Sequence, residues 1–522
     1  MMGQTIRHTT TLIASALAAA FATPSLADVT PQDVWDQWAG YLSAFGYTVE
    51  VEPVIDGPDI RFPRFEMTMY IPSEPASGIK GGTVVVGLGS VALLSQGDGT
   101  VAIEVPASMP ITVEGDGPGK EDFSALFSMM IEGHRTIASG VPGDIAYDFT
   151  AARIDLTLDE VEGRQGRMPI PGTIAVTMEG AAGMNRIASS GGTTKLEQSL
   201  TLGRLIYDFA LKDVDPGNPA EMTWKGEVSG LTMASDGVVP PKVNPLAIDK
   251  ALMSGYVVNT LMEFAAGKGA FGYTDPKTEM RIESASAGGK INIGMSATGL
   301  DYNVLSEGIA LSVAGSEIPF PISTTAEAVG VGIKLPVIAG ANEQPFAANV
   351  AVTELTIPEP FWMMADPENG LPHDPVTVEL ALSGKTRLFV DIMNEAAMSR
   401  LDRVGGVPGE LTALNLEALT ISGAGAEVKA AAVFDIDNTR KSAFNPELPA
   451  FGGDADLTLR GVTTLLSKLG QLGLIPMQQA LIGSGMIQQL GKQGDGVDEY
   501  SADIKLTPEG AMTINGMAVP LQ

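Results

Sequence analysis

The segment Thr150–Glu162 has the sequence TAARIDLTLDEVE and is followed directly by Gly163. Its larger apolar side chains recur at nearly every second position: Ile154, Leu156, Leu158 and Val161. Alternation with a period of two, ended by glycine, is typical of a half-buried antiparallel strand. The segment therefore predicts a strand with one face on an apolar interior.

The same alternation recurs along most of the chain, in Gly172–Met178, Lys195–Leu211, Met222–Met233, Lys290–Ala297, Val376–Ala381 and Asp454–Leu459. The 61 glycines and 34 prolines punctuate these runs. Four dipeptides have the composition of tight turns: Asp98-Gly99, Asp116-Gly117, Asp236-Gly237 and Asn515-Gly516. We therefore predict a mainly β fold (β-rich α+β) of antiparallel sheets.

A few segments have helical patterns instead. Thr30 and Pro31 form an N-cap followed by proline at the first helical position, and Gly46 ends this N-terminal helix. Its apolar face consists of Trp35, Trp38, Leu42 and Phe45. We also predict a central helix over Asn244–Ala266, a C-terminal pair over Val462–Leu472 and Pro476–Leu490, and a shorter helix over Asn394–Leu401.

The pentapeptide AFGYT occurs twice, at Ala44–Thr48 and Ala270–Thr274, each time after a predicted helix. Ser108–Ile111 also has a loose counterpart in Glu317–Phe320. These matches suggest two similar halves, residues 28–243 and 244–522, that arose by duplication. The alternative is chance similarity in a chain rich in alanine and glycine.

The N-terminus has the pattern of a secretory signal. Arg7 precedes an apolar run, Leu12–Ala22, and Ser25-Leu26-Ala27 resembles a signal peptidase site. We expect residues 1–27 to be removed after Ala27 and the protein to be exported to the periplasm of a Gram-negative bacterium. No later apolar run reaches the roughly 18 residues of a membrane helix, so no transmembrane anchor is expected after cleavage.

Composition excludes several classes of function. The chain has no cysteine, which rules out disulfides, thiolate metal sites and a cysteine nucleophile. Cleavage would remove one basic residue and no acidic one, which leaves a net charge of about −31. Because phosphates would be repelled, nucleic acid is not an expected partner. Hydrophobic residues make up 44% of the chain, which is enough to form a core.

Motifs for catalysis are weak. His134 and His373 lie far apart in sequence and without metal-site spacing, and no G-x-S-x-G motif is present. Ser77–Lys80 matches S-x-x-K, but Pro75 and Gly81 favour a loop over the required helix start. Ser383–Thr386 resembles the end of a phosphate-binding loop but lacks its first glycine. We predict no catalytic residue and no cofactor.

Acidic clusters offer a possible cation site. Asp435–Thr439 begins like a calcium loop, but Arg440 and Pro446 stand where glycine and glutamate are required. A second cluster comprises Asp495, Asp498, Glu499 and Asp503. Because solvated acidic surfaces are common in acidic proteins, we predict no dedicated metal site.

The order of several short motifs resembles the domain of unknown function 2125 family. They are Trp35–Trp38, Gly40–Leu42, Phe45–Tyr47, Met109–Ile111, Pro408–Leu411, Leu414, Leu416, Leu419, Ile421, Gly423-Ala424, the helices over Leu465–Leu481, Thr507–Gly510 and Asn515-Gly516. The resemblance implies an exported alphaproteobacterial protein without an assigned activity, and it transfers no site residue. The C-terminal pattern is also similar to that of large envelope proteins of the AsmA type.

Three classes of function remain. The first is a non-enzymatic envelope protein that binds an amphiphilic or lipid-like ligand along its amphipathic strands. The second is a structural protein that interacts with other envelope proteins and has no small ligand. The third is a hydrolase, for which no pair among the 62 acidic residues can be chosen. The first hypothesis requires a sheet face that nothing covers; the oligomeric state is left open.

Overall fold

The computed structural model describes residues 28–71, 81–116, 123–163, 166–169, 171–213, 219–243, 247–443 and 445–519. Strands account for 62% of the structure and helices for 13%, which confirms the mainly β class. The predicted signal segment, Ser77–Lys80 and Gly117 of the second turn dipeptide lie outside the described residues.

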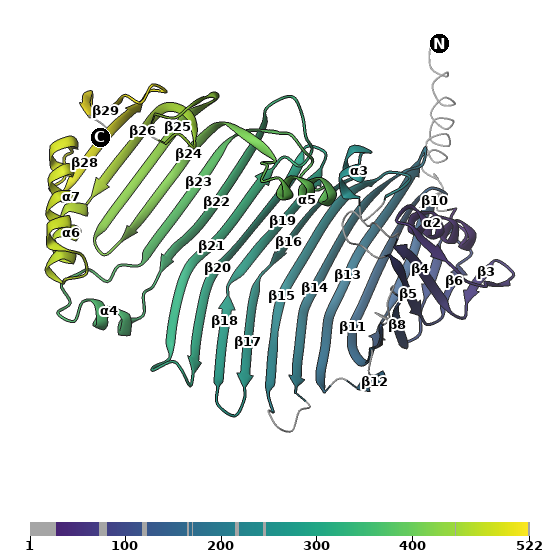
Figure 1. Ribbon diagram of the computed structural model, residues 1–522. Helices are drawn as coiled ribbons and strands as arrows, with labels where there is room; N and C mark the ends of the chain where they lie inside the picture. Colours follow the sequence, from purple (N-terminus) through teal and green to yellow (C-terminus); the bar gives the residue numbers. More distant parts are fainter. Residues whose placement is uncertain are drawn as a thin grey trace, which may run out of the picture.

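The strands in the described part of the chain form one antiparallel sheet of thirty strands (Figure 1). It is continuous where the sequence suggested a boundary between halves. β15 (Glu221–Val239) pairs directly with β16 (Val257–Phe264) and β17 (Ala266–Thr274). The expected separate sheets are therefore joined into one, and an origin by duplication stays a prediction.

The sheet divides at β11 (Asp144–Gly163), which contains the segment Thr150–Glu162. The first half of β11 pairs into one branch: β10 (Arg135–Val141), β7 (Val101–Glu104), β6 (Val91–Ser95), β3 (Asp59–Phe62) and β2 (Val54–Asp56). Its second half pairs into another: β9 (Phe123–Glu132), β8 (Ser108–Asp116), β5 (Gly82–Leu88), β4 (Phe65–Ile71) and β1 (Tyr47–Val49). The short β12 (Gly166–Pro169) also pairs with β11.

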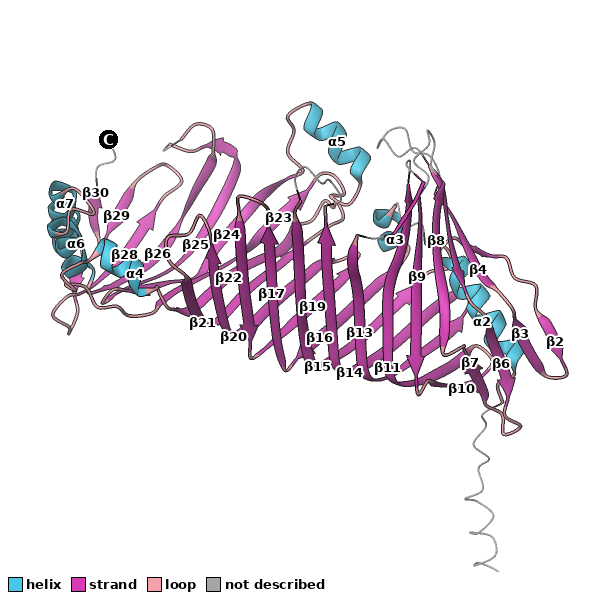
Figure 2. Ribbon diagram, turned by 90° about the horizontal axis from the view of Figure 1, so that it is seen from below, coloured by secondary structure: helices cyan, strands magenta, loops and turns pink. Residues whose placement is uncertain are grey.

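The predicted N-terminal helix is confirmed as α2 (Pro31–Ala44), and its apolar face packs between these branches (Figure 2). Thr30 and Asp33 form a capping box at its start. Val34 is completely buried, and Trp35 packs against Phe62 of one branch and Phe65 of the other. This contact closes one end of the sheet with an apolar core.

On the other side of β11, the sheet continues through long strands in this order: β13 (Gly172–Ser190), β14 (Thr193–Lys212), β15, β16 with β17, β19 (Gly288–Ser296) with β18 (Glu279–Ser286), β20 (Gly299–Gly315), β21 (Ile322–Leu335), β22 (Gln344–Leu355) and β23 (Val376–Leu388). It ends with β24 (Gly409–Gly423), β25 (Ala426–Lys441), β26 (Pro449–Arg460), β28 (Glu499–Leu506), β29 (Met512–Ile514) and β30 (Met517–Val519); β27 (Lys492–Gln493) pairs with β28.

The long strands bend midway, and the sheet is folded along this line into an open trough (Figure 2). We call the line the seam. It consists of four facing pairs of small residues: Gly133 with Ala152, Gly180 with Gly203, Gly230 with Ala265, and Gly308 with Ala287. In each pair one glycine has a φ near +60°, a conformation that other residues adopt with strain.

The exposure of residues beside the seam shows which face lies inside the bend. Leu202 and Leu231 face each other there and are 5% and 8% exposed, whereas the neighbouring Gly203 and Gly230 are exposed on the opposite side. The apolar core along the bend also includes Leu205, three residues after Leu202. β14 thus takes three residues, instead of two, to return to the inner face at the seam, and β15 does the same between Val228 and Leu231.

The other helices lie at the margins of the sheet: α3 (Ile248–Met253), α4 (Glu359–Ala365), α5 (Glu395–Arg403), α6 (Val462–Gln471) and α7 (Met477–Leu490). The C-terminal pair and the short helix after Asn394 are confirmed, and Asn394 caps α5 as an N-cap residue should. The α6–α7 pair lies at the C-terminal end of the trough in both views.

Three local predictions are wrong. In the described part of the central helix predicted over Asn244–Ala266, only α3 is helical. Val257–Phe264 is a strand whose backbone pairs with β15 on one side and β19 on the other. The second AFGYT, Ala270–Thr274, therefore lies within β17 and does not follow a helix. Asp236-Gly237 lies inside β15 instead of a turn, with Gly237 between Leu196 and Val258.

Candidate functional site

The candidate site is the inner face of the trough. Side chains at paired positions of neighbouring strands point to the same side, so the register identifies its rows. One row runs through Ile293, Tyr302, Ile333, Ala348, Leu382, Leu416, Ala432, Ala455 and Ile504. The adjacent row runs through Ile291, Val304, Val331, Val350, Leu380, Leu419, Ala430, Leu457 and Ala502. Neither row contains a charged residue.

These inner rows are not covered by another layer of the described chain. Ile293 and Ile333 remain 37% exposed, and Val350 remains 44% exposed. By contrast, the clusters of buried apolar residues lie between α2 and the two branches, along the seam, and beside α3. The apolar face therefore continues out of the closed, packed end into an open trough that extends to β28.

The outer face carries the charges. A chain of ion pairs crosses five strands through Arg153, Glu179, Arg204, Glu227 and Lys268, with N–O distances from 2.7 to 4.0 Å. All five side chains are at least 29% exposed, so solvent screens them and each pair adds little stability. The arrangement instead makes the outer face polar, in contrast to the apolar inner rows.

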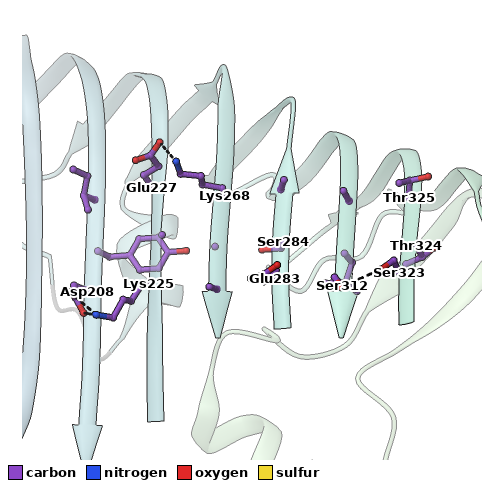
Figure 3. Close-up of a pocket in the computed structure, with 18 residues that line it drawn as sticks. Asp208, Lys225, Glu227, Lys268, Glu283, Ser284, Ser312, Ser323, Thr324 and Thr325 are labelled. Atoms are coloured by element: carbon purple, nitrogen blue, oxygen red, sulfur yellow. Dashed lines mark hydrogen bonds and ion pairs between the residues drawn. The ribbon is translucent and has the colours of Figure 1, made fainter. Parts of the chain in front are cut away.

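The same outer face has a shallow hollow of about 740 Å³ (Figure 3). It lies between two rows of side chains that begin at Ile206 and Asp208 and point away from the trough. Its edges hold the ion pairs Asp208–Lys225 and Glu227–Lys268, and Ser312 contacts Ser323. These six polar groups of the hollow therefore bind one another.

Inside the trough, one short row differs from its neighbours. Asn185, Gln198, Ser235 and Thr260 follow one another across β13, β14, β15 and β16. Gln198 donates to Asn185 at 3.4 Å, and the hydroxyls of Ser235 and Thr260 lie 2.9 Å apart. The row is thus polar but uncharged, and all four residues are half-buried.

His134 and His373 lie in different surroundings. His134 lies between β9 and β10, where its ring contacts the Thr136 hydroxyl at 2.9 Å; burial lowers the pKa of His134. His373 stacks on Trp362 with ring centroids 4.4 Å apart, and its Nδ1 lies 3.4 Å from Glu359. Within the described residues neither ring contacts a serine, so the arrangement gives no support to a serine hydrolase.

The other sequence candidates have structural roles. Ser383–Thr386 lies within β23, and Asp435–Thr439 lies within β25, where Asp437 accepts bonds from Thr439. Asp498 accepts bonds from the hydroxyl of Thr463 and the backbone N–H of Thr464 at the start of α6. In the part of the chain that the structure describes, no three His, Asp or Glu side chains are grouped to hold a metal.

Sequence reasoning identified amphipathic strands but missed the trough. The alternation of Lys195–Leu211 predicts one apolar face, but it does not show that this face is uncovered. The seam is detectable in the sequence, because the spacing of apolar residues changes from two to three at Gly203. Without the register of neighbouring strands, that irregularity has no evident meaning.

Comparisons with known proteins do not extend these observations. No protein-family model matches the chain, and no curated protein matches it. The resemblance to the domain of unknown function 2125 family therefore stays a prediction, as do the signal segment and periplasmic location. None of the described helices is long and apolar enough to cross a membrane.

Proposed function

We propose that the trough binds an extended amphiphile, such as a lipid, with its hydrocarbon chain along the inner rows. The observation that carries this proposal is an apolar face, free of charge in its two long rows, that remains about 40% exposed at Ile333 and Val350. Exposed apolar surface of this extent is unfavourable in water and typically marks a binding site.

The dimensions suit a chain-like ligand better than a compact one. Nine strand-to-strand steps separate β16 from β28, which corresponds to about 43 Å at the usual spacing of about 4.8 Å. The rows follow the axis of the trough, so a ligand lying along them replaces water over many side chains at once. The structural alternative, an envelope protein without a small ligand, predicts a trough that carries no lipid.

The first test is direct. The protein is purified without detergent and extracted with organic solvent, and lipid is quantified by mass spectrometry against an unrelated acidic exported protein. We expect stoichiometric enrichment of an amphiphile. A lipid-free protein would favour the structural alternative, and crosslinking would then identify its partner.

A matched pair of variants sharpens this test. Val350→Asp adds one charge to the inner face, whereas Asn349→Asp adds one charge on the outer face of the same strand. Because Val350 is 44% exposed, we expect both variants to fold. A charge against a hydrocarbon chain is poorly solvated, so Val350→Asp should weaken binding of an apolar fluorescent probe about tenfold or more. Equal binding by both variants would contradict the proposal.

A further inference from the structure

The polar row inside the trough has a defined place among apolar rows. On one side lies the row of Ile187, Leu196, Gly237 and Val258; on the other lies the row of Gly183, Leu200, Met233 and Met262. Toward α2 the row continues to Tyr147, whose hydroxyl donates to Gln37 of the helix at 2.6 Å. Toward the C-terminus it continues into Ile293 and Tyr302. Its amide side chains and aliphatic hydroxyls therefore lie toward the end of the trough that α2 closes.

This row retains capacity for hydrogen bonds. The bond between Gln198 and Asn185 uses one donor and one acceptor, whereas each primary amide can make about four hydrogen bonds. Of the two hydroxyls of Ser235 and Thr260, which bond each other, one still has a proton to donate. Amides and hydroxyls are suitable partners for ester, hydroxyl or amide groups of a ligand.

The same row cannot neutralise a charge. No lysine, arginine, aspartate or glutamate stands in this row or in the two rows beside it. Moving a carboxylate or phosphate from water to such a surface is strongly unfavourable unless a cation compensates its charge. The net charge of −30 opposes an anion further.

We infer that the ligand of the trough is an amphiphile with an uncharged, hydroxyl- or ester-bearing head group. Asn185, Gln198, Ser235 and Thr260 bind this head, and the hydrocarbon chain extends along the apolar rows toward β28. The inference rests on the proposed function and specifies its ligand class. It places the head near α2 and the chain toward the C-terminal helices.

The test compares three competitors of equal chain length: a monoacylglycerol, the fatty acid at a pH where it is ionised, and the alkylamine. Each displaces an apolar fluorescent probe from the full chain. We expect the monoacylglycerol to act at a concentration at least tenfold lower than the fatty acid anion. Acidification that neutralises the fatty acid should bring it close to the monoacylglycerol.

Variants test whether the polar row causes the preference for the monoacylglycerol over the fatty acid anion. Gln198→Leu with Thr260→Val should reduce the preference for the monoacylglycerol to less than about threefold. The outer-face control combines Ser199→Ala on β14 with Thr232→Val on β15. This control should leave the preference for the monoacylglycerol unchanged. Gln198→Lys introduces a cation and should shift the preference toward the fatty acid anion.

The outcomes separate this inference from the proposed function. If the probe binds but the anion or the amine displaces it as well as the monoacylglycerol does, the head-group inference is wrong and the trough still binds amphiphiles. If the probe does not bind to the protein at all, the proposed function fails, and the inference fails with it.

Discussion

At the scale of single residues, glycine at the seam determines where the sheet bends. Gly308 has a φ of +57°, and a Cβ added there would lie 2.5 Å from the Cβ of Ala287. Both the backbone conformation and the close approach therefore require glycine. Similar geometry recurs at Gly133, Gly180 and Gly230, so the bend arises from several positions acting in line.

We expect Gly308→Ala to lower the free energy of unfolding by about 1–3 kcal/mol, because it adds both left-handed strain and a steric clash. Urea denaturation followed by circular dichroism measures the change. Gly40→Ala is the control, since a Cβ there meets nothing within 4 Å on helix α2. It should be neutral or stabilise by about 0.5–1 kcal/mol, and equal loss in both variants would contradict the role of the seam.

The charges of the outer face make stability depend on pH. The hydrogen bonds from Arg153 hold the pKa of Asp155 below its usual value, despite partial burial that acts in the opposite direction. A carboxylate with a lowered folded-state pKa stabilises the protein above its unfolded-state pKa of about 3.9, and this stabilisation disappears as the pH falls through the folded-state value.

Asp155→Asn should therefore lower the urea midpoint at pH 7, and the difference from the unsubstituted protein should vanish near pH 2. Asp148→Asn serves as a control on the same strand, because Asp148 forms no ion pair among the described residues. A difference that is the same at both pH values would show that Asp155 acts by packing, not by charge.

At the scale of elements, long-range contacts decided several outcomes. Val257–Phe264 has apolar residues that fit a helical stripe, but its β-branched residues and two neighbouring strands favour β16. Helix α6 has Gly461 as its N-cap residue, which has no side chain for capping, and the missing cap comes from Asp498 beside β28. A local reading of the sequence identifies neither effect, because the deciding partners lie far along the chain.

Asp498→Ala should destabilise the α6–α7 pair by about 1–2 kcal/mol, since it leaves the Thr464 N–H without its acceptor at a helix start. Hydrogen exchange of the α6 amides measures this loss locally. Asp503→Ala, in the same acidic cluster but on β28, is the control and should leave exchange in α6 unchanged. Faster exchange in both variants would indicate a general effect of charge.

At the scale of the whole molecule, one sheet has two faces of different character. The inner face is apolar and open, the outer face is ion-paired, and α2 closes one end. This arrangement is what the proposed amphiphile binding depends on. It also joins the sequence-defined halves, because β15 pairs with both β16 and β17.

The halves should not be independent folding units. Residues 28–243 produced alone would expose β15, a 19-residue edge strand, and unpaired edges of this length promote association. We expect this fragment to aggregate in size-exclusion chromatography, whereas the fragment co-produced with residues 244–522 should form a soluble complex. A monodisperse fragment on its own would contradict this prediction and support a domain boundary at 243.

The sequence by itself determined the class of fold, the strands with clear alternation such as β11, β13 and β14, and the helices α2, α5 and the α6–α7 pair, because periodicity, caps and turn residues act over a few neighbouring positions. It also made the apolar face of each strand recognisable. Only the tertiary structure decided that these faces line up in register, bend at the seam and remain uncovered. Those features depend on pairing between strands that are separated in sequence, such as Thr260 with Ile293 or Val350 with Leu380, and alternation within one strand contains no information about its partner.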